Sequence, residues 1–439
     1  MTSKSRRHHR SRAATGIEEQ ILELQIGSPA HGGACVARDE DGRVVFVRHA
    51  LPGERVRARV TSSQKSLAWA DAVDILKASP DRVESVWPQA GPGGVGGGEL
   101  AHVAPHAQRA WKEKVIQDQL RRIGGPDCAA AVEELGGVQV QAAPGDECGD
   151  LTRRRTRIEL VIDQEGLAGM HRFRGREVIA LDSMPLAVTP IEELGILGAG
   201  SAWAELWRPK ERIRVVAANG QSPVVLTPKG AFNSLGEQVE TERLAWSVEV
   251  AGKNIEYRVR PTGFWQTHIK GAEVLANAVL SAAALNEGDR VLELYSGAGL
   301  FTRPLAEAIG PKGRLVSLEG DEGAVADAGE NLAPFGWVDA FVGGVDKEGI
   351  SELKAQLDGR PDVIVLDPPR AGAEREACQA IADTGASRIV LVSCDPAAGA
   401  RDLRELFEAG YRLSAFSAWD LFPHTHHVET LALLERQMF

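Results

Sequence analysis

The clearest pattern in the chain is a regular alternation, from about residue 275 onward, between helical stretches and short runs of apolar residues. Four such runs are each followed by a turn and then by a helical stretch: residues 291–294, 314–318, 363–366 and 389–392. Strands that are apolar on both faces are typical of a parallel sheet covered by helices on both sides. The pattern therefore predicts an α/β region built on a parallel sheet.

A different pattern occupies the N-terminal part, where β-rich runs are short and separated by turn residues. Residues 44–47 and 55–60 are two of these runs, and turns are predicted at residues 31–33, 39–42 and 51–53. Several short strands within about sixty residues favour a small closed barrel of the oligonucleotide-binding type.

The region between these two parts is predicted to begin with a loop and a helix. Residues 80–98 are rich in Pro and Gly, and residues 107–123 have a helical pattern that ends at Gly124. The segment from residue 136 to about 259 is rich in strands. Within it, residues 157–162 fit an edge or surface strand.

Charge and composition restrict the class of protein. A chain of 439 residues is too long for one core, so two or three domains are expected. The formal charge of −11 disfavours nucleic-acid binding by the molecule as a whole, but arginines gather locally. Residues 153–157 contain a cluster of four arginines. In Arg55 to Arg59 and in Arg172 to Arg176, every second residue is an arginine, a spacing that would place the arginines of each set on one face of a strand. Taken alone, each set is more typical of a solvated sheet face than of an RNA-binding surface.

Five scattered cysteines without a Cys-x-x-Cys spacing disfavour a disulfide scaffold and a zinc site. No apolar run is long enough to span a membrane, and no apolar segment follows the basic N-terminus as it would in a signal peptide. The sequence therefore predicts a cytoplasmic protein, with residues 1–14 as a disordered basic arm.

The turn after the first apolar run predicts the cofactor. Gly297 and Gly299 allow a tight turn, but Thr302 stands where a dinucleotide fingerprint has its third glycine. Glu293 suits an ammonium group, and Glu319, at the tip of the second run, suits a ribose diol, although it could also cap the helix that follows. An adenosine that carries an amino-acid tail is S-adenosylmethionine.

The third and fourth runs end in Asp367-Pro368-Pro369-Arg370 and Ser393-Cys394-Asp395-Pro396. Ligand sites of open α/β sheets lie at the carboxyl ends of the strands, so both tetrapeptides belong there. Cys394 is a candidate nucleophile for carbon 6 of uracil, because carbon 5 attacks a methyl donor only after such an addition. Glu429 is the candidate base that removes the carbon 5 proton. The nearby His424, His426 and His427 favour a structural or RNA-contacting role over a metal site.

Taken together, these motifs resemble the bacterial RNA 5-methyluridine methyltransferase family, over nearly the whole chain from about Thr15. Residues 51–56 and 79–83 resemble recurring phrases of a TRAM domain, and residues 153–155 resemble the arginines of the family's central domain. The resemblance extends to Gly263-Phe264-Trp265-Gln266, to the nucleophile segment at residues 393–403, and to the base segment that ends at Glu429.

The resemblance implies a fold, a division into domains and a set of site residues. The fold is α/β: a class I (Rossmann-like) methyltransferase domain at residues 260–439, a TRAM-type barrel at 15–78 and a strand-rich central RNA-binding domain at 79–259, whose helix 107–123 packs on the catalytic domain. The expected partner is structured RNA, either tRNA or ribosomal RNA, and a monomer is the default. The implied catalytic residues are Cys394 and Glu429, and the implied cofactor contacts are Gln266, Tyr295, Gly297, Glu319 and Asp367.

Several positions depart from the family. Many relatives hold an iron–sulfur cluster through cysteines whose matching positions here are Trp87, Val95, Gly98 and Met184, so we expect no cluster. His268 stands where relatives often have Asn, and Ser296 where they often have Cys. Asp346 is a weak candidate for a further cofactor contact.

Two other functions stay open at this point. A cytosine carbon-5 methyltransferase of RNA would also use a cysteine nucleophile. A non-catalytic RNA-binding protein would use the barrel and the arginines, but binding alone would not need Cys394, Glu429, Asp367 and Glu319.

Overall fold

The computed structural model describes residues 20–357 and 359–437, so the predicted basic arm lies outside the described residues. These residues fall into two compact units. One contains residues 20–30 and Ala34–Pro80, and the other contains His31–Gly33 and the chain from Asp81. Within the described residues, no helix is both long enough and apolar enough to cross a membrane.

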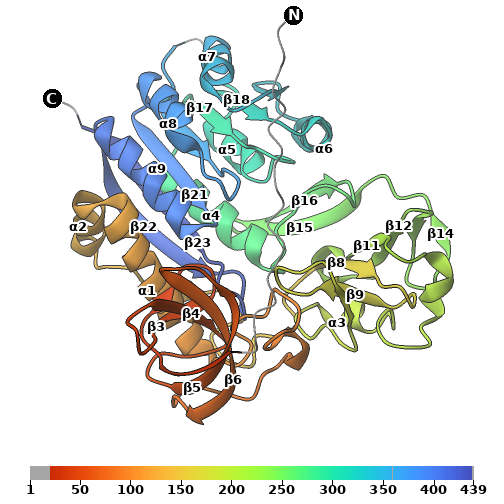
Figure 1. Cartoon of the computed structure of the whole chain (residues 1–439). Helices are drawn as coiled ribbons and strands as arrows, with labels where there is room; N and C mark the ends of the chain where they lie inside the picture. Colours follow the sequence, from red (N-terminus) through yellow and green to blue (C-terminus); the bar gives the residue numbers. More distant parts are fainter. Residues whose placement is uncertain (1–19, 358, 438–439) are drawn as a thin grey trace, which may run out of the picture. The chain divides into compact units, whose positions relative to one another are not determined.

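The first unit is a six-stranded sheet that curls into a barrel, as the sequence pattern predicts (Figure 1). Along its longest hairpin, Val56, Ala58 and Val60 point into the core, while the arginines between them point outward. Two of these arginines face acids on the neighbouring strands, since Arg55 pairs with Glu23 and Arg57 with Asp74. The strand order is β1-β5-β6-β4-β3-β2, with bounds β1 Ile21–Gln25, β2 Pro29–Ala30, β3 Ala34–Arg38, β4 Val44–Arg48, β5 Arg55–Ser63 and β6 Leu67–Lys77.

In the second unit, the central region is an antiparallel sheet of seven strands with its own apolar core. Its order is β10-β9-β8-β11-β12-β13-β14, with bounds β8 Arg157–Ile162, β9 Ala168–His171, β10 Val178–Ala180, β11 Arg212–Val216, β12 Val224–Thr227, β13 Gly230–Phe232 and β14 Gln238–Val239. The short helix α3 (Thr189–Glu192) and the 3-10 turns Pro88–Ala90, Ala202–Leu206 and Ala218–Gly220 lie in the connections.

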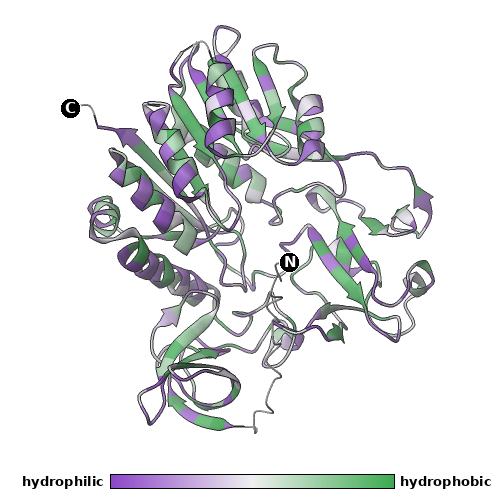
Figure 2. Cartoon of the chain, turned by 45° about the horizontal axis from the view of Figure 1, so that its top comes forward, coloured by the Kyte–Doolittle hydropathy of each residue, from purple (hydrophilic) through white to green (hydrophobic). Residues whose placement is uncertain are grey.

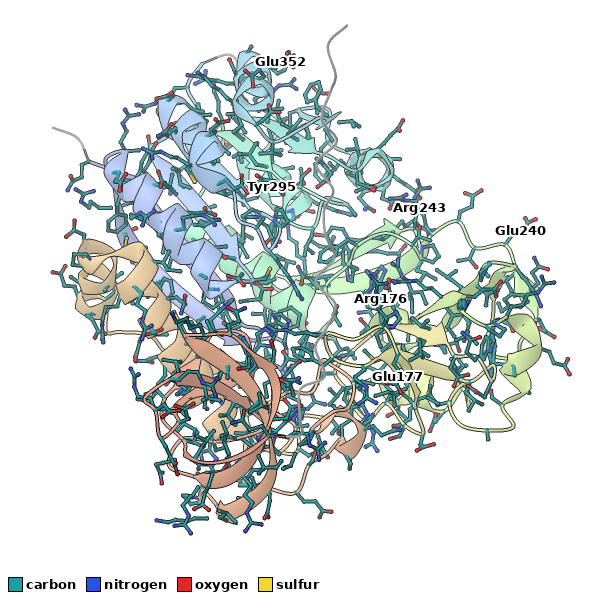
Figure 3. The ribbon with its side chains drawn as sticks, viewed as in Figure 1. Arg176, Glu177, Glu240, Arg243, Tyr295 and Glu352 are labelled. Carbon is teal, nitrogen blue, oxygen red and sulfur yellow. The ribbon has the colours of Figure 1, made fainter. Side chains whose placement is uncertain are left out.

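One expectation for this region is half right and another is wrong. Strand β8 lies between β9 and β11, so it is not an edge strand, but it is a surface strand: Leu160 is buried in the core while Glu159 on the other face is exposed. Arg172 to Arg176 do not form one face of a strand. They follow β9 as a turn in which Arg174 has a positive φ, and Arg172 pairs with Glu177 (Arg176 and Glu177 are labelled in Figure 3).

The catalytic region is an eight-stranded sheet of order β19-β18-β17-β20-β21-β23-β22-β7. The five strands from β19 to β21 are parallel, as the alternating pattern predicts, and β23 runs antiparallel to β21. The strand bounds are β17 Arg290–Leu294, β18 Arg314–Glu319, β19 Val338–Val342, β20 Val363–Leu366, β21 Arg388–Ser393, β22 Tyr411–Asp420 and β23 Glu429–Arg436.

Helices cover both faces of this sheet (Figure 2). Along β20, Ile364 and Leu366 enter one apolar core, while Val363 and Val365 enter the other, so the strand is buried on both sides. The helices are α4 Gly271–Ala283, α5 Thr302–Ile309, α6 Glu322–Leu332, α7 Lys347–Ala355, α8 Glu374–Asp383 and α9 Pro396–Glu408. The hairpin of β15 (Leu244–Val250) and β16 (Lys253–Val259) adds Trp246 and Tyr257 to the core under α4.

The segment around the predicted helix 107–123 also packs on the catalytic sheet. Helix α1 (Pro105–Gln119) continues into a π-helical turn (Leu120–Gly124), and α2 (Pro126–Glu134) leads to β7 (Val140–Ala142), which pairs in parallel with β22. Ile116 and Leu120 share one apolar core with Leu403 of α9. The domain limits drawn from the sequence stay a prediction.

Candidate active site

The parallel strands of the catalytic sheet deliver the predicted site residues to one edge. Tyr295 follows β17, Glu319 ends β18, Asp367 follows β20 and Cys394 follows β21. Strand β23 runs the opposite way and begins at Glu429, and Ser393 pairs with Thr430. The first residue of β23 is therefore next to the end of β21, which places Glu429 beside Cys394.

The Gly-rich turn after β17 is joined to the tip of β18. The amide of Gly297 donates to Oε2 of Glu319 at 2.9 Å, and Oε1 of Glu319 accepts the amide of Asp321 at 2.8 Å. Helix α6 is capped by Asp321, whose Oδ1 accepts the amide of Ala324. The alternative that Glu319 caps the following helix is therefore wrong. Asp321 is the cap, and the carboxylate of Glu319 faces the Gly-rich turn.

The same turn has an unfavourable backbone conformation at Tyr295, where φ is +61°. A bulky residue rarely adopts positive φ, and such strain gathers at ligand sites. The amide of Tyr295 donates to the carbonyl of Leu318 at 2.9 Å, which fixes the turn against β18. Tyr295 is labelled in Figure 3.

Glu293 is fully buried in β17, directly before this turn. Neither of its carboxyl oxygens has a hydrogen bond of normal geometry among the described residues, and the hydroxyl of neighbouring Thr302 lacks one too. Burial is the main cause that raises the pKa of Glu293 to about 8. The hydroxyl and amide of Thr302 lower this pKa, while the charges of Asp367 and Glu319 raise it. A buried acid in this condition is a good partner for a cationic group of a ligand.

Asp367 and Glu429 are two more carboxyl groups that share this environment. Burial raises the pKa of Asp367 to about 7. Burial also raises the pKa of Glu429 well above its ordinary range, the charge of Asp367 adds to that effect, and Arg370 opposes it. Because the charge of one carboxylate disfavours ionisation of the other, the two carboxyl groups lose their protons one after the other. The pair can therefore hold or accept a proton near neutral pH.

Cys394 lies between these acids and the start of α9. Burial and, to a lesser extent, the charges of Glu429 and Asp367 raise the pKa of its thiol to about 12, so the thiol is protonated in the free protein. Cys394 precedes Asp395, whose Oδ1 accepts the amides of Ala397 and Ala398 at 2.9 and 3.0 Å as the cap of α9. A helix N-terminus favours negative charge nearby, so this position stabilises a thiolate once it forms. Cys378, by contrast, is buried in an apolar core.

Among the described residues, no hydrogen bond or ion pair connects Gln266 to the other predicted cofactor contacts. It follows β16, is 7% exposed, and lines a cavity of about 390 Å³ together with Trp265, His268 and Lys270. His268 itself is buried, and its Nε2 lies 2.9 Å from Oδ2 of Asp146.

The sequence did not reveal the residues around the end of β19. A second cavity, of about 320 Å³, lies beside Leu318 at the tip of β18 and is lined by Phe341, Gly343 and Gly344. Strand β19 reads Val-Asp-Ala-Phe-Val and is half-exposed, so it gave no apolar run to identify it. Asp346 also lines this cavity, but its Oδ1 accepts the amide of Gly349 as the cap of α7.

No group of three or more His, Cys, Asp or Glu side chains in the described part of the chain could hold a metal ion. The positions that match the relatives' cluster cysteines lie in the central core instead. Trp87, Val95 and Met184 are buried there, and a Cβ on Gly98 would lie 2.9 Å from the indole of Trp87. These residues offer no thiolate, so they do not fit an iron–sulfur cluster.

Comparisons with known proteins agree with this geometry. Residues 356–437 match the family model of tRNA (Uracil-5-)-methyltransferase, and residues 18–73 match that of the TRAM domain. An uncharacterized RNA methyltransferase of Streptomyces avermitilis is 39% identical, with 94% of this chain and 98% of the relative covered. The 23S rRNA (uracil(1939)-C(5))-methyltransferase RlmD of Acinetobacter baumannii is 29% identical, with 94% and 95% covered.

The crystal structure of the Pyrococcus abyssi tRNA (uracil-54, C5)-methyltransferase, solved with S-adenosyl-L-homocysteine, has the same fold. It is 21% identical, has a TM-score of 0.65, and the match covers 94% of this chain and 100% of that one. The full-length match to the Streptomyces protein and the two family models lead to one conclusion: the chain belongs to the family of S-adenosylmethionine-dependent RNA (uracil-5-)-methyltransferases.

Proposed function

We propose that the protein methylates carbon 5 of a uridine in tRNA or ribosomal RNA through a covalent adduct between Cys394 and carbon 6. The observation that carries this proposal is the pairing of Ser393 with Thr430, which sets a cysteine and a buried carboxyl group side by side at the ligand edge of the sheet. A nucleophile beside a base that shares its environment is the arrangement that such an addition and elimination require.

The proposed reaction has two stages. In the first, the Cys394 thiol gives its proton to solvent and Sγ bonds to carbon 6 of uracil. The electrons released onto carbon 5 form its new bond to the methyl group as the bond between the methyl group and the donor sulfur breaks, and the donor leaves as the neutral thioether S-adenosylhomocysteine. In the second, the Glu429 carboxylate takes the proton from carbon 5, and the Sγ–carbon 6 bond breaks as the double bond re-forms. The free cysteine is regenerated, and Glu429 returns its proton to solvent.

S-adenosylmethionine supplies the transferable methyl group on a sulfonium centre. We assign its ribose to Glu319, whose carboxylate faces the Gly-rich turn, and its contacts near the reacting centre to Tyr295, Gly297 and Asp367. Gln266 completes the proposed cofactor set, a role that its resemblance to the family's Phe-Trp-Gln motif supports. The orphaned carboxyl of Glu293 supports the presence of a cationic ligand in this region.

The charge of the site supports the same assignment. Three buried carboxyl groups, those of Glu293, Asp367 and Glu429, all have raised pKa values, because burial disfavours their charged forms. A positively charged methyl donor would favour their ionised forms and would also favour the thiolate of Cys394. Binding of the donor would thereby prepare both the nucleophile and the base.

The RNA partner is proposed from the TRAM domain and from the relatives, which act on 23S rRNA and on tRNA. Nothing in the site itself favours one RNA over the other. We also propose that the enzyme works as a monomer in the cytoplasm, without an iron–sulfur cluster.

RNA that carries 5-fluorouridine provides a test of the covalent step. Fluorine replaces the proton that Glu429 would remove, so a reaction through Cys394 should stop at the methylated adduct. We expect a complex between protein and RNA that survives denaturing electrophoresis, that requires S-adenosylmethionine and that is lost in Cys394→Ala. Cys378→Ala is the matched control and should still form it. A stable complex formed by Cys394→Ala would disprove the role of this cysteine.

A further inference from the structure

The connection between β22 and β23 is more buried than most loops, and its polar groups form hydrogen bonds with helix α1. This base segment, residues 420–428, leads directly into Glu429, and its two ends are joined because Trp419 pairs with Glu429. Asp420, His424 and Thr425 are each no more than 3% exposed. Connections usually run over the surface, so a buried one requires partners for its polar groups.

Two side chains of α1 meet the base segment. Gln108 and Lys112 are four positions apart, so they lie on the same face of the helix, and both are 0% exposed. Lysine and glutamine are seldom fully buried unless their polar atoms are bonded.

Gln108 holds the middle of the base segment. Its Oε1 accepts the backbone amide of His424 at 2.7 Å, and its Nε2 lies 3.2 Å from Nδ1 of the same histidine. A backbone amide only donates, so Oε1 faces it and Nε2 faces the ring. The orientation of the Gln108 amide is thus fixed by its partners, and Nε2 also donates to the carbonyl of Val103 at 2.8 Å.

The contacts of His424 define its protonation. Its Nε2 lies 2.8 Å from the carbonyl oxygen of Asp150, which only accepts, so Nε2 carries the proton and Nδ1 accepts from Gln108. Burial lowers the pKa of His424, which agrees with a neutral ring. The residue has a φ of +65°, and its carbonyl accepts the amide of Leu100 at 2.9 Å. These bonds hold a backbone conformation that a histidine would otherwise avoid.

Lys112 holds the beginning of the segment. Its Nζ lies 2.5 Å from Oδ1 of Asp420 and donates to the carbonyl of Phe422 at 3.0 Å. Burial lowers the pKa of Lys112, and the charge of Asp420 opposes that effect. Loss of either partner would leave a buried charge unpaired, which is a costly arrangement.

We infer that Gln108 and Lys112 are positioning residues that set the place of Glu429 through the base segment. The inference rests on the proposed function, in which Glu429 removes the carbon 5 proton. Cys394 is carried by other elements, β21 and the start of α9. Disturbing the helix contacts should therefore slow the second stage of the reaction more than the first.

The test compares the two stages in a single turnover with labelled RNA and S-adenosylmethionine. Glu429→Gln serves as the reference, because it should methylate once and then remain bound to its product through Cys394. Gln108→Ala and the more conservative Gln108→Met should behave in the same direction, with adduct breakdown slowed about 100-fold, the size expected for a misplaced catalytic group. Their first methyl transfer should stay within about threefold of the wild-type rate, a loss of under 1 kcal/mol at 1.4 kcal/mol per tenfold.

The controls separate positioning from folding. Gln119→Ala removes a buried glutamine of the same helix whose side chain, within the described part of the chain, donates to its neighbour Asp118, and it should leave both stages unchanged. Lys112→Met tests the second anchor in the same assay and should also accumulate adduct. Equal slowing of both stages in Gln108→Met, with a lowered melting temperature, would reduce Gln108 to a structural residue and overturn the inference.

The behaviour of Glu429→Gln distinguishes a failure of the positioning inference from a failure of the proposed function. If Glu429→Gln accumulates adduct and the Gln108 variants do not, the positioning inference is wrong while the proposed function stands. If Glu429→Gln turns over as the wild type does, the base assignment fails and takes the positioning inference with it.

Discussion

The site edge of the catalytic sheet differs from the faces of the barrel and of the central sheet in how its charged groups are paired. At the site edge, Glu293 is buried beside Thr302 with no cation next to it among the described residues, and it shares its environment with Asp367 and Glu429. In the central sheet, Arg214 and Glu159 pair across neighbouring strands at 2.9 Å, and in the barrel Arg57 pairs with the exposed Asp74. Charges that satisfy one another belong to the scaffold, and charges left unsatisfied mark the place where a ligand must supply the counter-charge.

The largest effect that this comparison predicts is at Cys394. Replacing it with alanine should lower methylation by at least about 10⁴-fold, because no other group can add to carbon 6 and the steps act as a unit. The measurement is incorporation of labelled methyl groups into RNA under multiple turnover. Cys378→Ala is the control and should keep most activity, since Cys378 is buried in an apolar core. Substantial methylation by Cys394→Ala would show that the reaction does not need this cysteine.

The next effect is on the pH dependence of turnover. The base must be ionised, and burial raises the pKa of Glu429 while the charge of Asp367 raises it further. Turnover at saturating RNA and cofactor should therefore fall as the pH drops through the raised pKa of Glu429, well above the ordinary range of a carboxyl group. Asp367→Asn removes the neighbouring charge and should shift the profile to lower pH. Turnover that does not change between pH 6 and 9, or a pH profile that Asp367→Asn does not shift, would contradict the effect of Asp367 on the pKa of Glu429.

A smaller effect concerns the stability of the protein without its ligand. The pKa of Glu293 rises from 4.5 to about 8 on folding, so the folded state holds its proton more tightly than the unfolded state does. The stability from this group is complete below pH 4.5 and is lost as the pH rises through 8. The melting temperature of Glu293→Gln should therefore rise relative to that of the wild type as the pH increases from 5 to 8.5, by a few degrees at about 1 °C per kcal/mol for a chain of this length. A difference in melting temperature that does not change with pH would show that Glu293 is not a buried acid in the free protein.

The smallest effect is expected where the charges are paired and exposed. Arg57 and Asp74 are each more than half exposed, so their ion pair is screened by solvent. Arg57→Ala should change the free energy of unfolding by less than about 0.5 kcal/mol, measured by urea denaturation. If Arg57→Ala lowered the free energy of unfolding by several kcal/mol, the distinction between paired surface charges and unpaired charges of the site would be wrong.

The sequence predicted those parts of the fold whose signal is local. Apolar runs located β17, β18, β20 and β21, because strands buried on both faces need continuous apolar sequence. The half-exposed β19 gave no such run. The arginine pattern at residues 172–176 was misleading, because alternation in sequence does not distinguish a strand from a turn.

For the site, the sequence located the residues that stand directly at strand ends, such as Cys394 and Asp367. It could not locate the anchors of the base segment, because Gln108 and Lys112 lie more than 300 positions before their partners. Burial of a lysine or a glutamine depends on tertiary packing. Both residue types are usually exposed, so the sequence gives no sign that these two are buried. The same limit applies to Glu293, whose lack of a partner appears only once the sheet is assembled.

The most direct test of the account is nucleoside analysis of RNA that the enzyme has modified. The purified protein would be incubated with S-adenosylmethionine and, separately, with tRNA and with ribosomal RNA that lack their modifications, and the digests would be quantified by mass spectrometry. The account predicts new 5-methyluridine in one of the two pools and none with Cys394→Ala. New 5-methylcytosine in place of 5-methyluridine, or a cofactor-binding protein that methylates neither pool, would contradict it.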